Sequence, residues 1–237
     1  MQKDKVTMPR VLAFVVAAST ALVSAAALAA PSPERVRGTV KAISSDTLTV
    51  HTAAGPDVSV ALTGRTRYLE VTKSSLSHVD PGSYIGTATK SIGNKLVALE
   101  VVVFPPSMKG TGEGHYAWDR IADTTLSGST TTASTMTNGT VSTTAPAGGA
   151  KLADSSMTNG TVSSAGAADG AKQITVTYKG GTQTVLVPPT APIVTYQPGT
   201  RSDVTPGSYV FVNGVSQDGK VTANAVAVGV DGARPPM

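Results

Sequence analysis

The second half of the chain repeats the first, and this repeat is the strongest constraint on the fold. The segment VDPGSYI (79–85) returns as VTPGSYV (204–210), and LTV (48–50) returns as ITV (174–176). The matching segments follow one another in the same order in both halves. A solenoid needs at least three stacked units, so two copies favour a tandem pair of closed domains instead.

Both copies carry the sequence pattern of short β-strands. Between residues 36 and 104, apolar residues occupy alternate positions in about six short segments, of which Val58-Ser-Val60-Ala-Leu62 is the clearest. The breaks between the segments are rich in turn residues, as in Asp80-Pro-Gly82 and Gly93-Asn94. No segment has a helical period of useful length. The predicted fold is therefore all-β, with each copy forming a small β-barrel domain.

The region between the copies differs in composition. Residues 124–154 are almost entirely Thr, Ser, Ala and Gly, which cannot bury a hydrophobic core, and we expect a flexible linker there. The predicted organisation is a signal peptide at 1–29, a first β-barrel domain at 34–105, a linker at 106–156 and a second β-barrel domain at 157–232.

A shorter duplication complicates the start of the second domain. The sequence MTNGTVS occurs at 136–142 and again at 157–163, so two segments compete for the place of one strand. The later copy leaves a shorter loop to the strand near Ile174, and closing a shorter loop costs less entropy. We therefore expect the later copy in the sheet and the earlier copy in the flexible linker.

The N-terminus has the features of a secretory signal peptide. Three basic residues precede an apolar run at 11–22, which is followed by a small-x-small cleavage site at 27–29. The run is too short and too alanine-rich for a permanent anchor, and no later stretch is suited to span a membrane as a helix. After signal cleavage we expect no integral membrane span, and a periplasmic or secreted location.

Composition limits the chemistry that the chain can perform. The absence of cysteine excludes disulfides, thiolate metal sites and a cysteine nucleophile. The formal charge is +4, of which residues 1–29 contribute about half, and aromatic residues make up only 4% of the chain. Charge this weak and aromatics this sparse argue against nucleic acid as a partner.

The GTV, LTV and PGSY pattern resembles an uncharacterised family of exported bacterial β-barrel domains related in shape to the OB-fold. The resemblance covers both repeats and excludes the signal peptide and the linker. It implies a tandem pair of small OB-like barrels. The family has no agreed activity, so the resemblance assigns none to this chain.

One segment gathers the residues best suited to binding. Residues 112–119, GEGHYAWD, hold the only tryptophan, one of the three histidines and two acidic residues. Glu113, His115 and Asp119 offer oxygen and imidazole ligands to a divalent metal. Tyr116 and Trp118 offer rings on which a ligand can stack. The alternative is structural: the two rings pin the linker against a barrel.

Other polar residues are expected to have structural roles. His78 and Asp80 lie in a turn whose second copy carries different residues, so we expect hydrogen bonds of the turn rather than a catalytic pair. Tyr84 and Tyr209 occupy equivalent positions, in the core or at a barrel rim. No positioned nucleophile and base, phosphate-binding loop or dinucleotide motif appears, so we expect no catalytic residues and no enzyme.

The sequence favours a non-enzymatic envelope protein, either a binding module or a scaffold, whose partner is an envelope protein or a small ligand. The alternative is a metal-binding accessory protein of a transport or homeostasis system. That alternative depends on Glu113, His115 and Asp119.

Overall fold

The computed structural model describes residues 30–52, 55–125, 131–146 and 171–236, and all structural statements concern this part of the chain. It is all-β, as predicted, and its helical segments are single 3₁₀ turns. None of these helical segments has the length and apolar character needed to cross a membrane. The predicted signal peptide at 1–29 and the later MTNGTVS copy at 157–163 lie outside the described residues.

The strands, in chain order, are β1 (Ser32–Ile43), β2 (Thr47–Thr52), β3 (Asp57–Ala61), β4 (Arg67–Lys73), β5 (Tyr84–Ile92), β6 (Lys95–Val103), β7 (Gly114–Ala117), β8 (Ile121–Ala122), β9 (Thr131–Thr132), β10 (Thr135–Pro146), β11 (Lys172–Tyr178), β12 (Gly181–Val187), β13 (Ile193–Pro198), β14 (Tyr209–Gln217) and β15 (Lys220–Gly229). The 3₁₀ turns are η1 (Leu76–His78), η2 (Pro106–Met108) and η3 (Arg201–Asp203).

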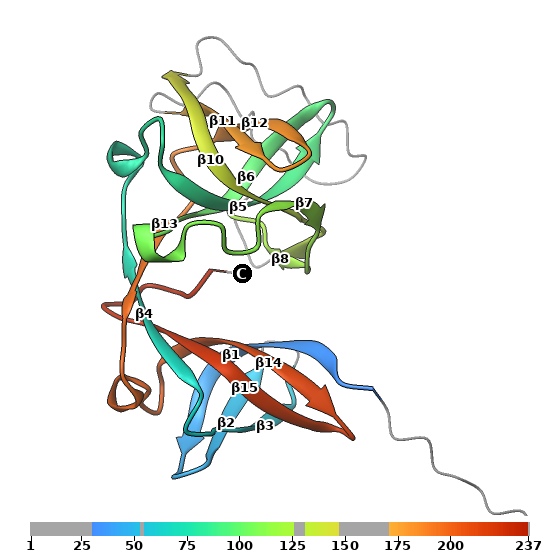
Figure 1. Ribbon diagram of the computed structural model, residues 1–237, viewed down its shortest axis with the longest axis vertical. Coiled ribbons are helices and arrows are strands. Elements are labelled where there is room, and N and C mark those ends of the chain that lie inside the picture. Colours follow the sequence, from blue (N-terminus) through green and yellow to red (C-terminus); the bar gives the residue numbers. More distant parts are fainter. Residues whose placement is uncertain (1–29, 53–54, 126–130, 147–170, 237) are drawn as a thin grey trace, which may run out of the picture.

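The strand pairings form two closed rings, one above the other in Figure 1. In the first ring, β1, β2 and β3 pair in succession, β15 pairs in parallel with β3, and β14 joins β15 to β1. In the second ring, β10, β11 and β12 pair in succession, β6 pairs in parallel with β12, and β5 joins β6 to β10. Each ring therefore combines three strands of one half with two strands of the other.

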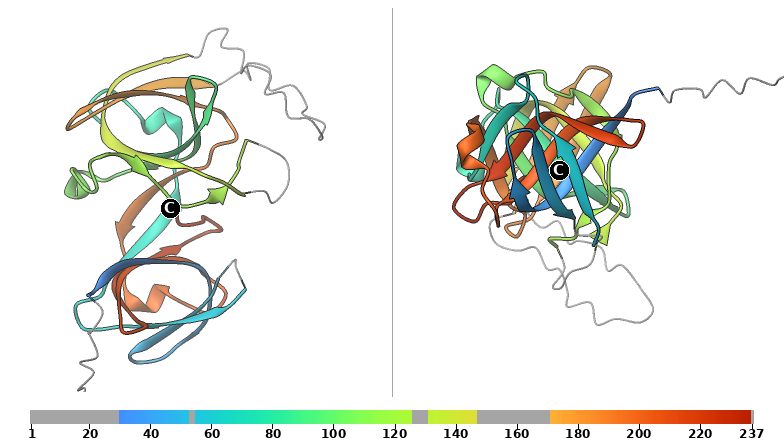
Figure 2. Two further views of the ribbon diagram at one scale, coloured as in Figure 1. Left: turned by 90° about the vertical axis from the view of Figure 1, so that its right-hand side faces the viewer. Right: turned by 90° about the horizontal axis from the view of Figure 1, so that it is seen from below.

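This exchange overturns the expected division into separate domains at 34–105 and 157–232. The cause lies in β4 and β13, which run from one ring to the other instead of folding back (Figure 1). They pair antiparallel with each other, and they also pair with β15 and β6. Figure 2 shows the result, with blue strands closing on red ones and green strands closing on orange ones.

The two halves are nevertheless equivalent, as the repeat predicts. Val71 of β4 and its counterpart Tyr196 of β13 pair with each other, which places a local two-fold axis at this point. Each PGSY loop contacts a strand from the other half of the chain: Gly82 N donates to Val141 O of β10, and Gly207 N donates to Val40 O of β1. The repeat thus identifies equivalent residues correctly, but each segment has its partner in the other half.

The predicted linker at 106–156 contains a central strand, which contradicts the expectation of flexibility there. The earlier MTNGTVS copy lies in β10, where it pairs with β5 and β11 and where Met136 and Asn138 are buried. The preference for the later copy is therefore wrong. The physical reason is β7, which pairs with residues 135–138. The earlier copy closes a smaller loop with β7 than the later copy would, and this gain opposes the longer loop toward β11.

Hydrophobic residues form three clusters, one inside each ring and one between the rings. The clusters inside the rings are mostly β-branched, as expected for tightly packed strands. The cluster between the rings is richer in aromatic residues, with Tyr84, Phe104 and Tyr196 buried in it. It is also the cluster against which the 112–119 segment packs, because Trp118 contacts it.

A glycine at the β1–β2 contact offers a direct test of this packing. A Cβ added to Gly38 would overlap the carbonyl group of His51 on β2. We expect Gly38→Ala to lower the free energy of unfolding by about 1–3 kcal/mol, because the strands must separate to accommodate the methyl group. Gly64→Ala is the control, since a Cβ there meets nothing within 4 Å. Urea denaturation measures both; equal effects would contradict the β1–β2 packing.

Candidate functional site

A cleft of about 860 Å³ lies between the two rings. One wall comes from β14, β15 and the start of β4, and the opposite wall comes from residues 104–118. The lining residues are Thr63, Arg65, Arg67, Leu69, Phe104, Ser107, Met108, Thr111, Gly112, Tyr116, Trp118, Asn138, Tyr196, Phe211, Asn213, Thr222, Ala223, Asn224, Ala225 and Ala227.

Aromatic side chains concentrate at this cleft. The chain has only ten Phe, Trp and Tyr residues, and five of them line the cleft: Phe104, Tyr116, Trp118, Tyr196 and Phe211. Phe104 stacks on Tyr196 with ring centroids 5.8 Å apart, and Tyr116 meets Trp118 edge-on at 5.8 Å. Half of the few aromatic residues in this chain therefore line one cavity, and a lining of aromatic side chains is typical of ligand pockets.

The first ring clamps Trp118 in place. The guanidinium carbon of Arg35 lies 4.2 Å from the centroid of the Trp118 ring, a cation–π contact. Arg35 donates to both carboxylate oxygens of Asp119 at 3.0 and 2.8 Å, and Arg37 donates to Oδ2 at 2.6 Å. Hydrogen bonds from Arg35 lower the pKa of Asp119, and Arg37 adds to this effect against the cost of burial. These contacts hold the aromatic segment against β1.

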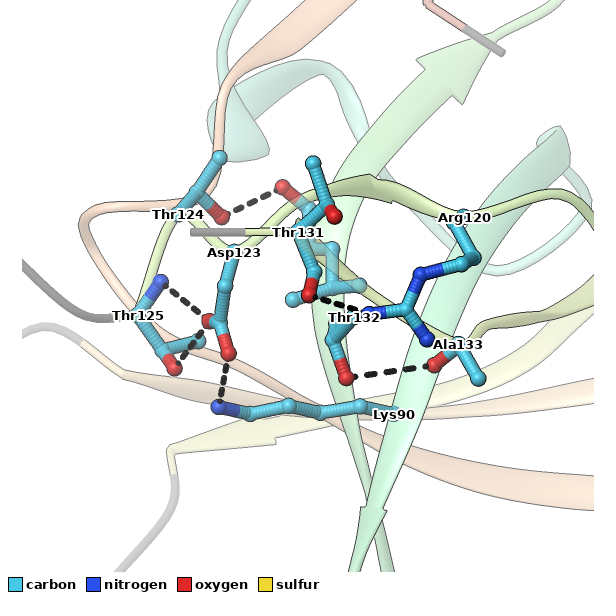
Figure 3. Close-up of polar contacts among 9 residues, drawn as sticks. Lys90, Arg120, Asp123, Thr124, Thr125, Thr131, Thr132 and Ala133 are labelled. Atoms are coloured by element: carbon cyan, nitrogen blue, oxygen red, sulfur yellow. Dashed lines mark hydrogen bonds and ion pairs between the residues drawn. The ribbon is translucent and has the colours of Figure 1, made fainter. Parts of the chain in front are cut away.

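A second ion pair fixes the chain that follows Trp118 (Figure 3). Lys90 of β5 donates to Asp123 at 2.7 Å, and the two side chains are only 13% and 5% exposed. Asp123 also accepts hydrogen bonds from the backbone N and hydroxyl of Thr125, and Thr124 donates to Leu99 O. Burial alone would raise the pKa of Asp123, but the hydrogen bonds from Lys90 and Thr125 lower it. This cluster anchors residues 119–125 on the second ring.

The structure does not bring the predicted metal ligands together. Glu113 Oε1 accepts a hydrogen bond from Lys179 N at 2.8 Å, His115 Nδ1 lies 2.8 Å from Thr137 Oγ1, and Asp119 binds two arginines. His115 also stacks on Tyr178 with ring centroids 6.2 Å apart. Within the described part of the chain, no group of three or more His, Asp and Glu side chains is arranged to hold a metal ion.

The predicted ligand-binding pair, Tyr116 and Trp118, does lie together at the cleft. Trp118 is half-buried against the cluster between the rings, and Tyr116 is 37% exposed. The pair therefore packs against the core between the rings, as the structural interpretation expects, and it also lines the cleft. The other three aromatic residues of the cleft have no distinguishing signal in the sequence, because each lies in or next to a strand whose pattern indicates only core.

The remaining predicted residues have structural surroundings. His78 ends η1, with Nδ1 3.4 Å from Ser74 Oγ, and Asp80 N donates to Ser83 Oγ within the following turn. Tyr84 is buried, donates to Thr111 O, and has its pKa raised to about 12 by burial. Tyr209 instead lies 38% exposed beneath the guanidinium of Arg234. The two tyrosines occupy equivalent positions but not equivalent surroundings.

Polar groups are gathered around the aromatic wall. Trp118 Nε1, Asn138 Oδ1 and two nitrogens of Arg37 are buried with no hydrogen-bond partner in the part of the chain that the structure describes. Arg65 and Arg67 line the cleft and are exposed, and none of the described residues that line it is acidic. Unsatisfied buried groups are rare in native proteins, so these atoms call for a partner such as an ordered water or a ligand.

The lowered pKa values of Asp119 and Asp123 predict acid sensitivity. Because both are below the unfolded value of about 3.9, their ion pairs stabilise the protein above that pH, and this stability is lost as pH falls through the folded values. We expect the urea midpoint to be steady near neutral pH and to drop below about pH 4. In Asp119→Asn/Asp123→Asn the midpoint is lower at neutral pH and its acid-dependent drop is smaller; an unchanged drop would contradict the assignment.

Comparison with protein families, curated proteins and solved structures gives no significant match for this chain.

Proposed function

We propose that the chain is a non-enzymatic binding protein that takes up a small organic molecule in the cleft between its two rings. The observation that carries this proposal is the concentration of five of the ten aromatic residues around one cavity of about 860 Å³. Cavities of this size, lined by apolar and aromatic side chains with a few polar groups, are typical of small-molecule sites.

The lining favours binding over catalysis. Its side chains include two arginines, three asparagines and several hydroxyl groups, but among the described residues that line it there is no histidine, aspartate, glutamate or lysine. General acid–base catalysis near neutral pH commonly relies on such groups, and nucleophilic catalysis needs a base beside the nucleophile. Asparagine, arginine and aromatic rings orient and hold a ligand without transferring protons.

The proposed setting is the bacterial periplasm or exterior, and its support is the signal peptide that the sequence predicts at 1–29. We further propose that each ring is a small OB-like barrel, since five strands closed by one parallel contact fit that class. The two-ring arrangement supplies what one ring lacks, namely a cleft with walls from both.

Trp118 makes the proposal directly testable, because it is the only tryptophan and it lines the cleft. The probe is N-phenyl-1-naphthylamine, a neutral aromatic compound whose own emission rises in apolar surroundings. We expect saturable binding at micromolar concentrations, with energy transfer from Trp118 to the probe. Saturation at one site per chain supports the proposal.

Two matched variants distinguish probe binding in the cleft from probe binding on other surfaces. Ala225→Phe fills the cleft from β15 and is expected to abolish probe binding, whereas Ala42→Phe adds the same ring at an exposed position of β1 outside it. Absence of binding by the unmodified chain, or equal binding by both variants, would overturn the proposed function.

A further inference from the structure

The floor of the cleft is apolar in one row of residues and polar in the next, and this difference indicates the class of ligand that the cleft suits. Three neighbouring strands contribute two rows of residues to it. Phe211 of β14 lies opposite Ala227 of β15, which lies opposite Leu69 of β4. Two residues along each strand, and therefore on the same face, lie Asn213, Ala225 and Arg67. All six line the cleft, so an apolar row adjoins a polar, cationic one.

In both rows a small residue lies between two large ones. Ala225 and Ala227 occupy the central strand, β15, while the flanking strands carry longer side chains. This leaves a trough along β15 that runs from the apolar row to the polar row. The apolar end belongs to the aromatic wall, because Leu69 and Phe211 both pack on the cluster between the rings.

The backbone that carries the two arginines is fixed by the sheet and by turn hydrogen bonds without any ligand. Arg67 begins β4 and pairs with Ala225, so its backbone is fixed by the sheet. Arg65 lies in a turn tied to β15 by Thr66, whose buried hydroxyl donates to Ala223 O at 3.0 Å. Thr63 N donates to the same hydroxyl at 2.9 Å, and Arg65 N donates to Thr63 Oγ1 at 3.2 Å. A fixed backbone reduces the entropy that ligand binding costs.

The two guanidinium groups at this end are free to bind an anion. Within the described residues, neither Arg65 nor Arg67 makes a side-chain hydrogen bond or ion pair, and no acidic residue lines the cleft. Arg35 and Arg37 differ, because both form ion pairs with Asp119. Guanidinium groups bind carboxylate, phosphate and sulfonate groups through directed, charge-assisted hydrogen bonds.

We infer that the ligand is an amphipathic anion, with an apolar or aromatic body against Phe211, Leu69 and the aromatic wall and one anionic group at Arg65 and Arg67. This inference rests on the proposed function and specifies its ligand class. The amide of Asn213, in the same row as Arg67, adds a neutral donor beside the charged ones.

The test compares two probes that share one ring system. 8-Anilinonaphthalene-1-sulfonate carries the N-phenylnaphthylamine body of the neutral probe plus one sulfonate. We expect the unmodified chain to bind the sulfonate about tenfold more tightly than the neutral probe, the ratio that one additional charge-assisted hydrogen bond supplies. Added salt should weaken binding of the sulfonate only.

The Arg65→Gln/Arg67→Gln variant is expected to bind both probes with the affinity of the neutral one. Lys41→Gln/Lys220→Gln removes the same charge outside the cleft lining and is expected to keep the tenfold preference. Equal affinity of the unmodified chain for the two probes, or a preference that survives in the arginine variant, would overturn the anion inference while leaving the proposed function intact. Binding of neither probe by the unmodified chain would overturn both.

Discussion

A fragment of residues 30–105 is expected to fail to fold as a monomer, although it contains one complete copy of the repeat. Its β1, β2 and β3 lack β14 and β15, so the first ring stays open and both of its edges lose their partners. The core of that ring loses Val210, Val212 and Val226 together. Each buried valine contributes about 1.5–3 kcal/mol, so the loss of these three alone is comparable to the total stability of an ordinary domain of this size.

Circular dichroism during urea titration and sedimentation velocity test this expectation. The fragment should show no cooperative unfolding as a monomer, and any folded form should be a dimer in which each copy supplies β5 and β6 to the other. The full chain cut between 147 and 170 is the companion experiment. Fragments 30–146 and 171–237 should each be unfolded alone and recover strand structure when mixed. A cooperatively folded monomer of residues 30–105 would contradict the exchange of strands between the halves.

The sequence predicts the strands well because their signals are local. Alternating apolar residues mark β2 and β3, and the turn at Asp218-Gly219 joins β14 to β15, with both residues at positive φ (51° and 74°) as a two-residue hairpin requires. The repeat also identifies equivalent residues correctly, since the carbonyls of Val40 and Val141 each accept from the glycine N of a PGSY loop and their N–H groups each donate to the carbonyl of the serine that follows that glycine.

The exchange of strands could not be predicted, because the two halves offer interchangeable faces. Leu48 and Ile174 line the cores of different rings, and each would suit the strands of its own half as well as those of the other. The outcome depends on whether β4 continues straight from one ring to the other. The seven residues of β4 include no glycine or proline, so nothing in them indicates a bend. A straight β4 does not by itself show which strands it will pair with.

In the candidate site too, the sequence identifies residues that are close together in the chain but not those that only strand pairing brings together. Tyr116 and Trp118 stand out because they are close in sequence and rare in composition. The cleft itself needs Phe211 and Arg67, which are far apart in the chain and meet only through the β14–β15–β4 pairing. Proximity in sequence was also the basis of the predicted metal site, which the structure does not assemble. Glu113 and Asp119 lie six residues apart, but they bind opposite parts of the molecule, the β11–β12 turn and β1.

The anchor of the aromatic segment is expected to give the largest effect of any single substitution. Asp123→Ala leaves the Lys90 ammonium group buried without its counter-ion, and Lys90→Met leaves the Asp123 carboxylate in the same position. Breaking a buried ion pair from one side costs about 3–5 kcal/mol, because an uncompensated charge remains in the protein interior. Urea denaturation followed by Trp118 fluorescence measures this cost, and it also reports whether Trp118 becomes exposed when residues 119–125 detach.

The double variant Lys90→Met/Asp123→Leu decides whether the pair acts as a unit. With both charges replaced by apolar side chains of similar size, no buried charge remains, and we expect the double variant to lose less stability than either single variant. The side chain of Asp80 is exposed, so Asp80→Ala is the control and should change stability by no more than about 0.5 kcal/mol. If the losses of the two single variants instead add in the double variant, Lys90 and Asp123 stabilise the segment independently and the ion pair is not its anchor.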